Sequence, residues 1–88
     1  MDESSISAVS DAVMTLLRLG FHEMGLNRVW LTTVEYNGRA IACYKRCGFR
    51  EEARLRQDVF RHGRYWDFVL MAILRQEFDE QREGGHDV

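Results

Sequence analysis

The spacing of apolar positions divides the chain into two helical and three extended segments. Over residues 7–24 the apolar side chains recur every three or four positions, which places them on one face of a helix. Ser7 or Ser10 can cap the start of this helix. Gly25 suits its end, because helices commonly finish in the left-handed backbone that glycine accepts. We therefore expect an amphipathic helix near the beginning of the chain.

Three later segments have the composition and alternation of β-strands. Residues 28–35 are mostly β-branched or aromatic, and both alternating sets of positions carry bulk, which predicts a strand covered on both faces. Residues 49–60 alternate apolar and polar side chains, and residues 65–74 are apolar nearly throughout, so the turn between them predicts a hairpin. Asn37 is placed to cap a short helix between the first strand and this hairpin, and Gly48 is placed to end it.

The order helix, strand, helix, hairpin predicts one small α/β (α+β) domain with a small mixed sheet. We expect an N-terminal segment over residues 1–6, the folded unit over residues 7–78 and a flexible tail over residues 79–88. The strand from Arg28 to Glu35 lacks a neighbour on one side, because the hairpin supplies only one. An unpaired edge recruits another chain, so we expect a homodimer or a complementing subunit to complete the sheet through this strand.

Composition adds limits to this picture. With 45% hydrophobic and 11% aromatic residues the chain is expected to fold, and its net charge of −2 gives no strong attraction for nucleic acid. No apolar run reaches the ~18–20 residues of a membrane span. No signal-peptide pattern stands at the start, so we expect a cytoplasmic protein with neither nucleic acid nor membrane as a partner. Cys43 and Cys47 lie four apart without two further ligands nearby, which predicts reduced, partly buried thiols and no metal site.

The most informative stretch runs from Asn37 to Phe49 and reads NGRAIACYKRCGF. Its Asn, the Ala near the helix start, the Tyr one turn later and the final Gly-Phe resemble the second signature of the GCN5-related N-acetyltransferases (GNAT). Residues 25–29 and 63–71 resemble the start of the family's fifth strand and its last hairpin. The closest branch acetylates the N-termini of ribosomal proteins and related amines. The resemblance implies the C-terminal half of an acetyltransferase domain, without the family's first four strands and two helices.

The resemblance also implies a mechanism. In the family, acetyl-CoA lies where the fourth and fifth strands splay apart, its pantetheine arm bonds to strand backbone, and an amine attacks the thioester directly. Acetyl-CoA is therefore implied as the acetyl donor, a primary amine as the acceptor, and Tyr44 as the acid that protonates the departing thiolate. The implied cofactor-binding residues are Asn37, Arg39, Ala40, Val34, Ser7 and Ser10. Without the family pattern, Asn37 is equally well a plain helix cap, and Tyr44 is more often a core residue.

Two departures from the family bear on catalysis by this chain alone. The family's pyrophosphate loop corresponds to residues 4–9, where Ser7 and Val9 stand in for the small residues that let backbone approach the phosphates. The base that deprotonates the amine usually comes from the absent half. Glu35 is the one local carboxylate that we nominate, and its alternative reading is a solvated residue at a strand end. We expect either an acetyltransferase that works with a partner or a non-catalytic remnant that serves as an interaction module.

Overall fold

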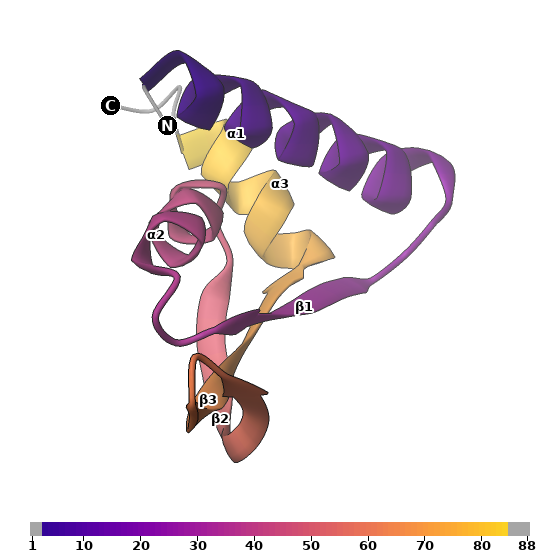
Figure 1. Cartoon of the computed structure of the whole chain (residues 1–88). Coiled ribbons are helices and arrows are strands. Elements are labelled where there is room, and N and C mark those ends of the chain that lie inside the picture. Colours follow the sequence, from indigo (N-terminus) through magenta and orange to yellow (C-terminus); the bar gives the residue numbers. More distant parts are fainter. Residues whose placement is uncertain (1–2, 85–88) are drawn as a thin grey trace.

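Residues 3–84 are described in the computed structural model, and side chains over residues 10–81. The chain runs through α1 (Glu3–Arg18), a five-residue π-helix η1 (Leu19–Glu23), β1 (Arg28–Val34), α2 (Gly38–Arg46), β2 (Arg50–Arg61), β3 (Arg64–Leu74) and α3 (Arg75–Gly84) (Figure 1). The predicted order of helix, strand, helix and hairpin is confirmed. No helix within the described range is long and apolar enough to cross a membrane.

The three strands form one antiparallel sheet in the order β1-β3-β2. The predicted hairpin of β2 and β3 is confirmed, and it turns at His62 and Gly63, which both have a positive φ. The prediction of a mixed sheet is wrong. β1 and β2 do run parallel, since both are antiparallel to β3, but β3 lies between them and separates the two parallel strands.

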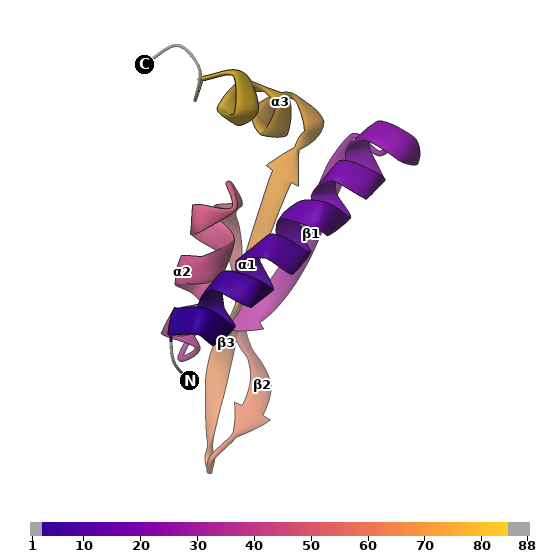
Figure 2. The same cartoon turned by 90° about the horizontal axis from the view of Figure 1, so that it is seen from above.

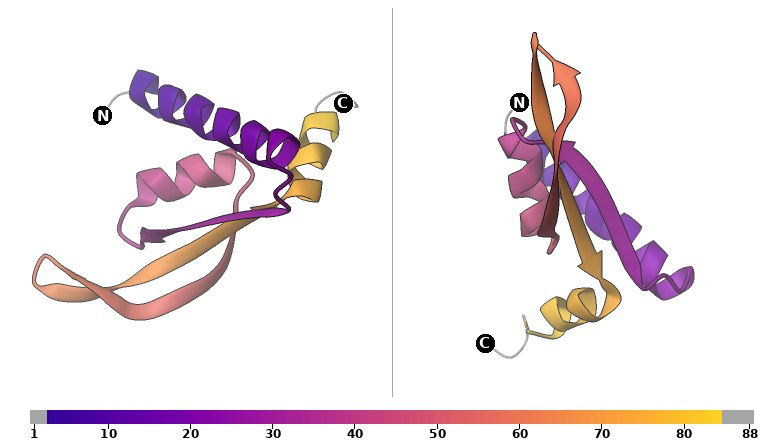
Figure 3. Two further views of the ribbon diagram at one scale, coloured as in Figure 1. Left: turned by 90° about the vertical axis from the view of Figure 1, so that its right-hand side faces the viewer. Right: turned by 90° about the horizontal axis from the view of Figure 1, so that it is seen from below.

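β1 is an edge strand, and one of its faces is bare. Both α1 and α2 lie on the same side of the sheet (Figure 3, left). Val29 and Leu31 pack toward that side against the core, whereas Trp30, on the other face, is 60% exposed. The predicted unpaired strand edge is therefore confirmed. The prediction of a strand covered on both faces is wrong, because no described helix covers the side of Trp30.

The core lies between the sheet and the helices. β3, the central strand, supplies Val69, Met71 and Ile73, and the first helical segment supplies Leu17 and Phe21. Burying each of these apolar side chains stabilises the fold by about 1.5–3 kcal/mol. The predicted apolar face of the first helix is thus the face that packs on the sheet.

The C-terminal helix α3 is longer and better anchored than the sequence predicts. Residues 79–84, expected in a flexible tail, continue the helix, and the rest of that tail lies outside the described part of the chain. Phe78 is buried against Phe21, with ring centroids 5.4 Å apart. Gln81 donates a hydrogen bond of 3.0 Å to the carbonyl of Cys47 at the end of α2. These contacts between distant segments hold a helix whose own sequence is mostly polar.

Candidate functional site

The free edge of β1 presents a row of backbone hydrogen-bonding groups. Beside β3, the N–H of Glu35 donates to the carbonyl of Asp67 at 3.0 Å. In an antiparallel pair only alternate residues bond to the partner strand, so the odd-numbered residues of β1 face β3. The N–H and C=O groups of Arg28, Trp30 and Thr32 therefore point away from the sheet. Of the residues in β1, only Val34 was predicted from the sequence to contact the cofactor, because the register with β3 decides which positions of the strand face outward.

At the end of β1 the chain turns directly into α2. The carbonyl of Val34 accepts a hydrogen bond from the N–H of Asn37 (2.9 Å), and the side-chain oxygen of Asn37 accepts one from the N–H of Ala40 (3.3 Å). The predicted helix cap is thereby confirmed. The first turn of α2 has no acidic residue, so no carboxylate there offsets the positive end of the helix dipole. Val34, Asn37 and Ala40 are thus brought together, with Arg39 exposed beside them.

Tyr44 lies seven residues beyond the cap, about two helical turns along the same side of α2. Its ring is partly buried against the core and meets Phe49 edge-on, with centroids 5.6 Å apart. Among the residues that the structure describes, none forms a hydrogen bond with the Tyr44 hydroxyl. The two readings of Tyr44 are compatible in this geometry, because the ring packs while the hydroxyl is available as a proton donor.

Glu35, the nominated base, has both carboxylate oxygens engaged. Oε2 accepts a hydrogen bond of 2.6 Å from the N–H of Asp67, and Oε1 lies 3.6 Å from the guanidinium of Arg54. Asp67 in turn accepts a hydrogen bond from the N–H of Gln57 at 2.9 Å. These bonds tie the end of β1 to the middle of the hairpin. The geometry thus gives Glu35 a structural role, and its role as a base stays a prediction.

The two serines nominated for cofactor binding lie in α1. The helix begins at Glu3, so the loop predicted over residues 4–9 is wrong. That segment contains no glycine or proline to interrupt a helix, which explains why the helix continues through it. The side chain of Ser7 lies outside the described residues. The hydroxyl of Ser10 is turned toward α2, where its Oγ and the Sγ of Cys43 form a hydrogen bond of 3.2 Å.

Cys43 and Cys47 are free, buried thiols on the face of α2 that meets α1. The Sγ of Cys47 lies 3.8 Å from the backbone carbonyl of Ser10. Burial raises the pKa of the Cys47 thiol, and the neighbouring Cys43 adds to this effect. A buried thiol of raised pKa is a poor nucleophile. Within the described part of the chain, no group of three or more His, Cys, Asp or Glu residues is arranged to hold a metal ion.

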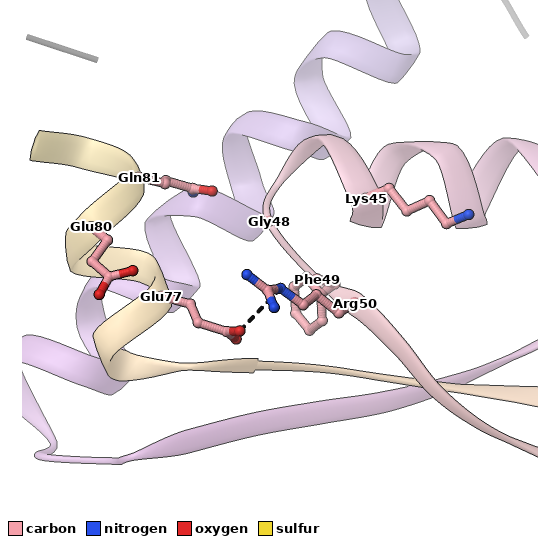
Figure 4. Close-up of a pocket in the computed structure, with 7 residues that line it drawn as sticks. All are labelled: Lys45, Gly48, Phe49, Arg50, Glu77, Glu80 and Gln81. Atoms are coloured by element: carbon pink, nitrogen blue, oxygen red, sulfur yellow. Dashed lines mark ion pairs between the residues drawn. The ribbon is translucent and has the colours of Figure 1, made fainter. Parts of the chain in front are cut away.

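A pocket of about 430 Å³ lies at the opposite end of α2, between the start of β2 and α3 (Figure 4). Its lining residues are Lys45, Gly48, Phe49, Arg50, Glu77, Glu80 and Gln81. Arg50 and Glu77 point toward one another across it and form an ion pair of 3.0 Å. The pocket lies some two helical turns from Asn37, so it is separate from the site at the end of β1.

Comparison with known proteins finds N-acetyltransferases among the relatives of this chain. The sequence profile of the "Acetyltransferase (GNAT) family" matches residues 9–49. The spermidine N(1)-acetyltransferase of Vibrio cholerae is 33% identical over 67 residues, which are 76% of this chain and 39% of the relative. A prophage-derived N-acetyltransferase of Bacillus subtilis is 29% identical over 69 residues, or 78% of this chain and 39% of the relative. Another B. subtilis relative, provisionally named a ribosomal N-acetyltransferase, is 28% identical over 74 residues, which are 84% of this chain and 40% of the relative.

Solved structures have the same fold as this chain, and the matched part is again less than half of each solved chain. A spermidine/spermine N-acetyltransferase from V. cholerae matches with a TM-score of 0.78 and 29% identity over 83% of this chain and 43% of that chain. The V. cholerae spermidine N-acetyltransferase in complex with CoA and spermine matches with a TM-score of 0.75 and 30% identity over 78% of this chain and 41% of its own. The chain thus spans about two fifths of the length of these relatives. It belongs to the GNAT acetyltransferase family and represents somewhat less than half of a member's length.

Proposed function

We propose that this chain carries the acetyl-CoA-binding part of an N-acetyltransferase that transfers the acetyl group to a primary amine. The observation that carries the proposal is the succession of three features along β1 and α2. The outward backbone groups of β1 run up to the turn at Asn37, where the positive end of α2 begins without a carboxylate in its first turn, and Tyr44 follows on the same helix. An extended arm with amide groups suits the strand edge, since it pairs there as an added strand does.

In this proposal Val34, Asn37, Arg39 and Ala40 border the cofactor. The side-chain oxygen of Asn37 is committed to its cap, which leaves the amide NH₂ of Asn37 to donate to a carbonyl of the arm. Ser7 is retained as a donor to the phosphates. Ser10 is not, because its hydroxyl already bonds to Cys43. The same residues thus serve as strand end, helix cap and cofactor contact.

Tyr44 takes the role of general acid. The amine nitrogen attacks the thioester carbonyl, a C–N bond forms, and the C–S bond breaks. The Tyr44 phenol gives its proton to the departing sulfur, so the products are an N-acetyl amine and the free thiol of CoA. The proton released by the amine goes to a base, a role for which Glu35 stays a prediction, and the carboxylate of Glu35 also accepts a hydrogen bond from the N–H of Asp67 and lies 3.6 Å from Arg54.

A second polypeptide is part of the proposal. The relatives are more than twice as long as the portion matched here, and β1 ends the described sheet with an unpaired edge. We therefore assign the other wall of the cofactor site and the acceptor pocket to a partner that docks along β1. Because the V. cholerae relatives act on spermidine and spermine by name, a polyamine is the first acceptor to assay.

The second candidate function is a non-catalytic interaction module. Two observations favour it: the segment that corresponds to the phosphate loop is helical, and Ser10 belongs to the contact between α1 and α2. Such a chain would keep the docking edge of β1 and lose the cofactor.

Calorimetric titration with acetyl-CoA separates the two candidates. The acetyltransferase proposal predicts saturable binding that weakens in Thr32→Pro, which removes an outward N–H without touching the ladder to β3. Leu55→Thr, a change at an exposed position of β2, is the matched control and should bind as the wild type does. Tighter binding by Ser7→Gly/Val9→Gly would support a weakened phosphate contact. Heat signals that do not saturate in any of these proteins would favour the interaction module.

A further inference from the structure

The pocket between the end of α2, the start of β2 and α3 has walls that are bonded to one another. Gln81 of α3 donates a hydrogen bond of 3.0 Å to the carbonyl of Cys47, where α2 ends. Glu77 of α3 pairs with Arg50 of β2 at 3.0 Å (Figure 4). The volume of about 430 Å³ lies within the roughly 300–1,000 Å³ of small-molecule pockets. The three walls are therefore fixed relative to one another, and the space between them suits a small ligand.

This pocket lies far from the site proposed for acetyl-CoA. The end of β1 is paired with β3 at Phe68, whereas its start is paired at Leu74, where α3 follows. Seen from above, α3 lies at one end of the long hairpin and the hairpin turn lies at the other (Figure 2). A ligand in the pocket would thus be a second ligand of the chain, independent of the cofactor.

Glu77 orients the guanidinium of Arg50. Its Oε1 accepts a hydrogen bond of 3.0 Å from the N–H of Leu74, and its Oε2 lies 3.0 Å from the Nε of Arg50. A guanidinium presents its donors as a rigid, planar fork, so a contact at Nε leaves the edge formed by Nη1 and Nη2 for another acceptor. Among the described residues, none other than Glu77 pairs with Arg50. Arg50 therefore offers the two parallel donors that bind a carboxylate bidentately.

Two more charged side chains with unused bonding capacity line the pocket. Lys45 on α2 forms no hydrogen bond or ion pair with any residue that the structure describes. Glu80 on α3 accepts a hydrogen bond of 3.1 Å from Gln76 at its Oε1, which leaves Oε2 for another donor. The pocket can thus bind a negative group through Arg50 and Lys45 and a positive group through Glu80.

The balance of charge selects the kind of ligand. Lys45 and Arg50 are positive, and Glu77 and Glu80 are negative, so these four charges cancel. A phosphate ester brings only negative charge and is repelled by both carboxylates, and a simple amine is repelled by both cations. A zwitterion meets opposite charges at both of its ends and has no net charge itself.

We propose that this pocket binds a free α-amino acid. Its carboxylate lies on the Nη1 and Nη2 edge of Arg50, with the ammonium of Lys45 beside it, and its own ammonium group lies on Glu80. The bound amino acid connects α2, β2 and α3. The inference goes beyond the proposed function and does not depend on acetyl-CoA.

Calorimetric titration of the whole chain with each of the standard amino acids tests the proposal. We expect saturable binding of at least one. Its decarboxylated amine and its deaminated acid, which each lack one charged group, should bind at least tenfold more weakly. Arg50→Lys, which keeps the charge but loses the planar fork, and Glu80→Gln should each weaken binding at least tenfold. Arg46→Gln, at an exposed position of α2 outside the pocket, is the matched control and should bind as the wild type does.

Circular dichroism of each variant verifies the fold. Three results would overturn the inference: no saturable binding of any amino acid, equal binding by the wild type, Arg50→Lys and Glu80→Gln, or analogues that bind as tightly as the amino acid itself. A chain that binds an amino acid but not acetyl-CoA would support this site and contradict the proposed function alone.

Discussion

Tyr44 combines a ring that packs on the core with a hydroxyl that no described residue binds. Tyr44→Phe removes only that hydroxyl, so we expect the free energy of unfolding to change by less than about 1 kcal/mol. Acetyl-CoA binding should also be unchanged. In an active complex with the partner, turnover should fall by roughly 10²–10⁴-fold, the usual contribution of a positioned acid. Denaturant unfolding and steady-state acetylation measure the two effects. An equally active variant would assign Tyr44 to packing alone.

Cys47 makes stability depend on pH. Its thiol is 2% exposed, and burial, with a contribution from Cys43, raises its pKa above the ordinary value of 9.0. The folded state then holds the proton more tightly than the unfolded chain does. The stability that this thiol contributes is complete below pH 9 and is lost as the pH rises through the folded-state pKa.

We therefore expect the free energy of unfolding to fall as the pH rises above 9, and to fall less steeply in Cys47→Ala. Urea unfolding at pH values on both sides of 9 measures the two slopes, and Cys47→Ala controls for all other titrating groups. Equal slopes in the two proteins would mean that the thiol titrates alike in the folded and unfolded states.

Among the elements, the docking of α3 against the end of α2 depends on Gly48. This residue has a φ of 106°, and a side chain there would collide with Gln81 and meet Ile73 at 3.0 Å. Gly48→Ala is expected to lower the free energy of unfolding by about 1–3 kcal/mol through backbone strain. Displacement of Gln81, which bonds to the carbonyl of Cys47, adds to that loss.

The double variant Gly48→Ala/Gln81→Ala tests this coupling. It should be less destabilised than the sum of the single variants, because the Gln81 contact is lost in both. Thermal unfolding of the four proteins gives the comparison. Strict additivity would show that α3 is held by Phe78 and its neighbours without help from Gln81.

At the scale of elements, the helices and turns that are determined by residues close together in the sequence were predictable. The cap at Asn37, the turn between β2 and β3 and the apolar face of the first helix each depend on residues close together in the sequence. The place of β3 between β1 and β2 was not predictable, because a hairpin can pair with β1 through either of its strands. The length of α3 likewise depends on the contact of Phe78 with Phe21, far away in the sequence.

At the scale of the whole molecule, the candidate site was predictable only in part. Asn37, Ala40 and Val34 do lie together, as the family resemblance implies. The engagement of Glu35 was not predictable, since it depends on Asp67, 32 residues away. The row of outward backbone N–H and C=O groups on β1 was not predictable either, since it follows from the register of β1 with β3. The partner remains a proposal because the matched portion covers about two fifths of the relatives.

Amide hydrogen exchange along β1 tests the central claim most directly, namely that the free edge of this strand holds acetyl-CoA. The amides of Trp30 and Thr32 point outward, whereas those of Leu31 and Thr33 face β3 and bond to it. We predict that saturating acetyl-CoA slows exchange at Trp30 and Thr32 and leaves Leu31 and Thr33 nearly unchanged. Unaltered exchange at Trp30 and Thr32, at concentrations where acetyl-CoA binds, would contradict the account and place the ligand elsewhere on the chain.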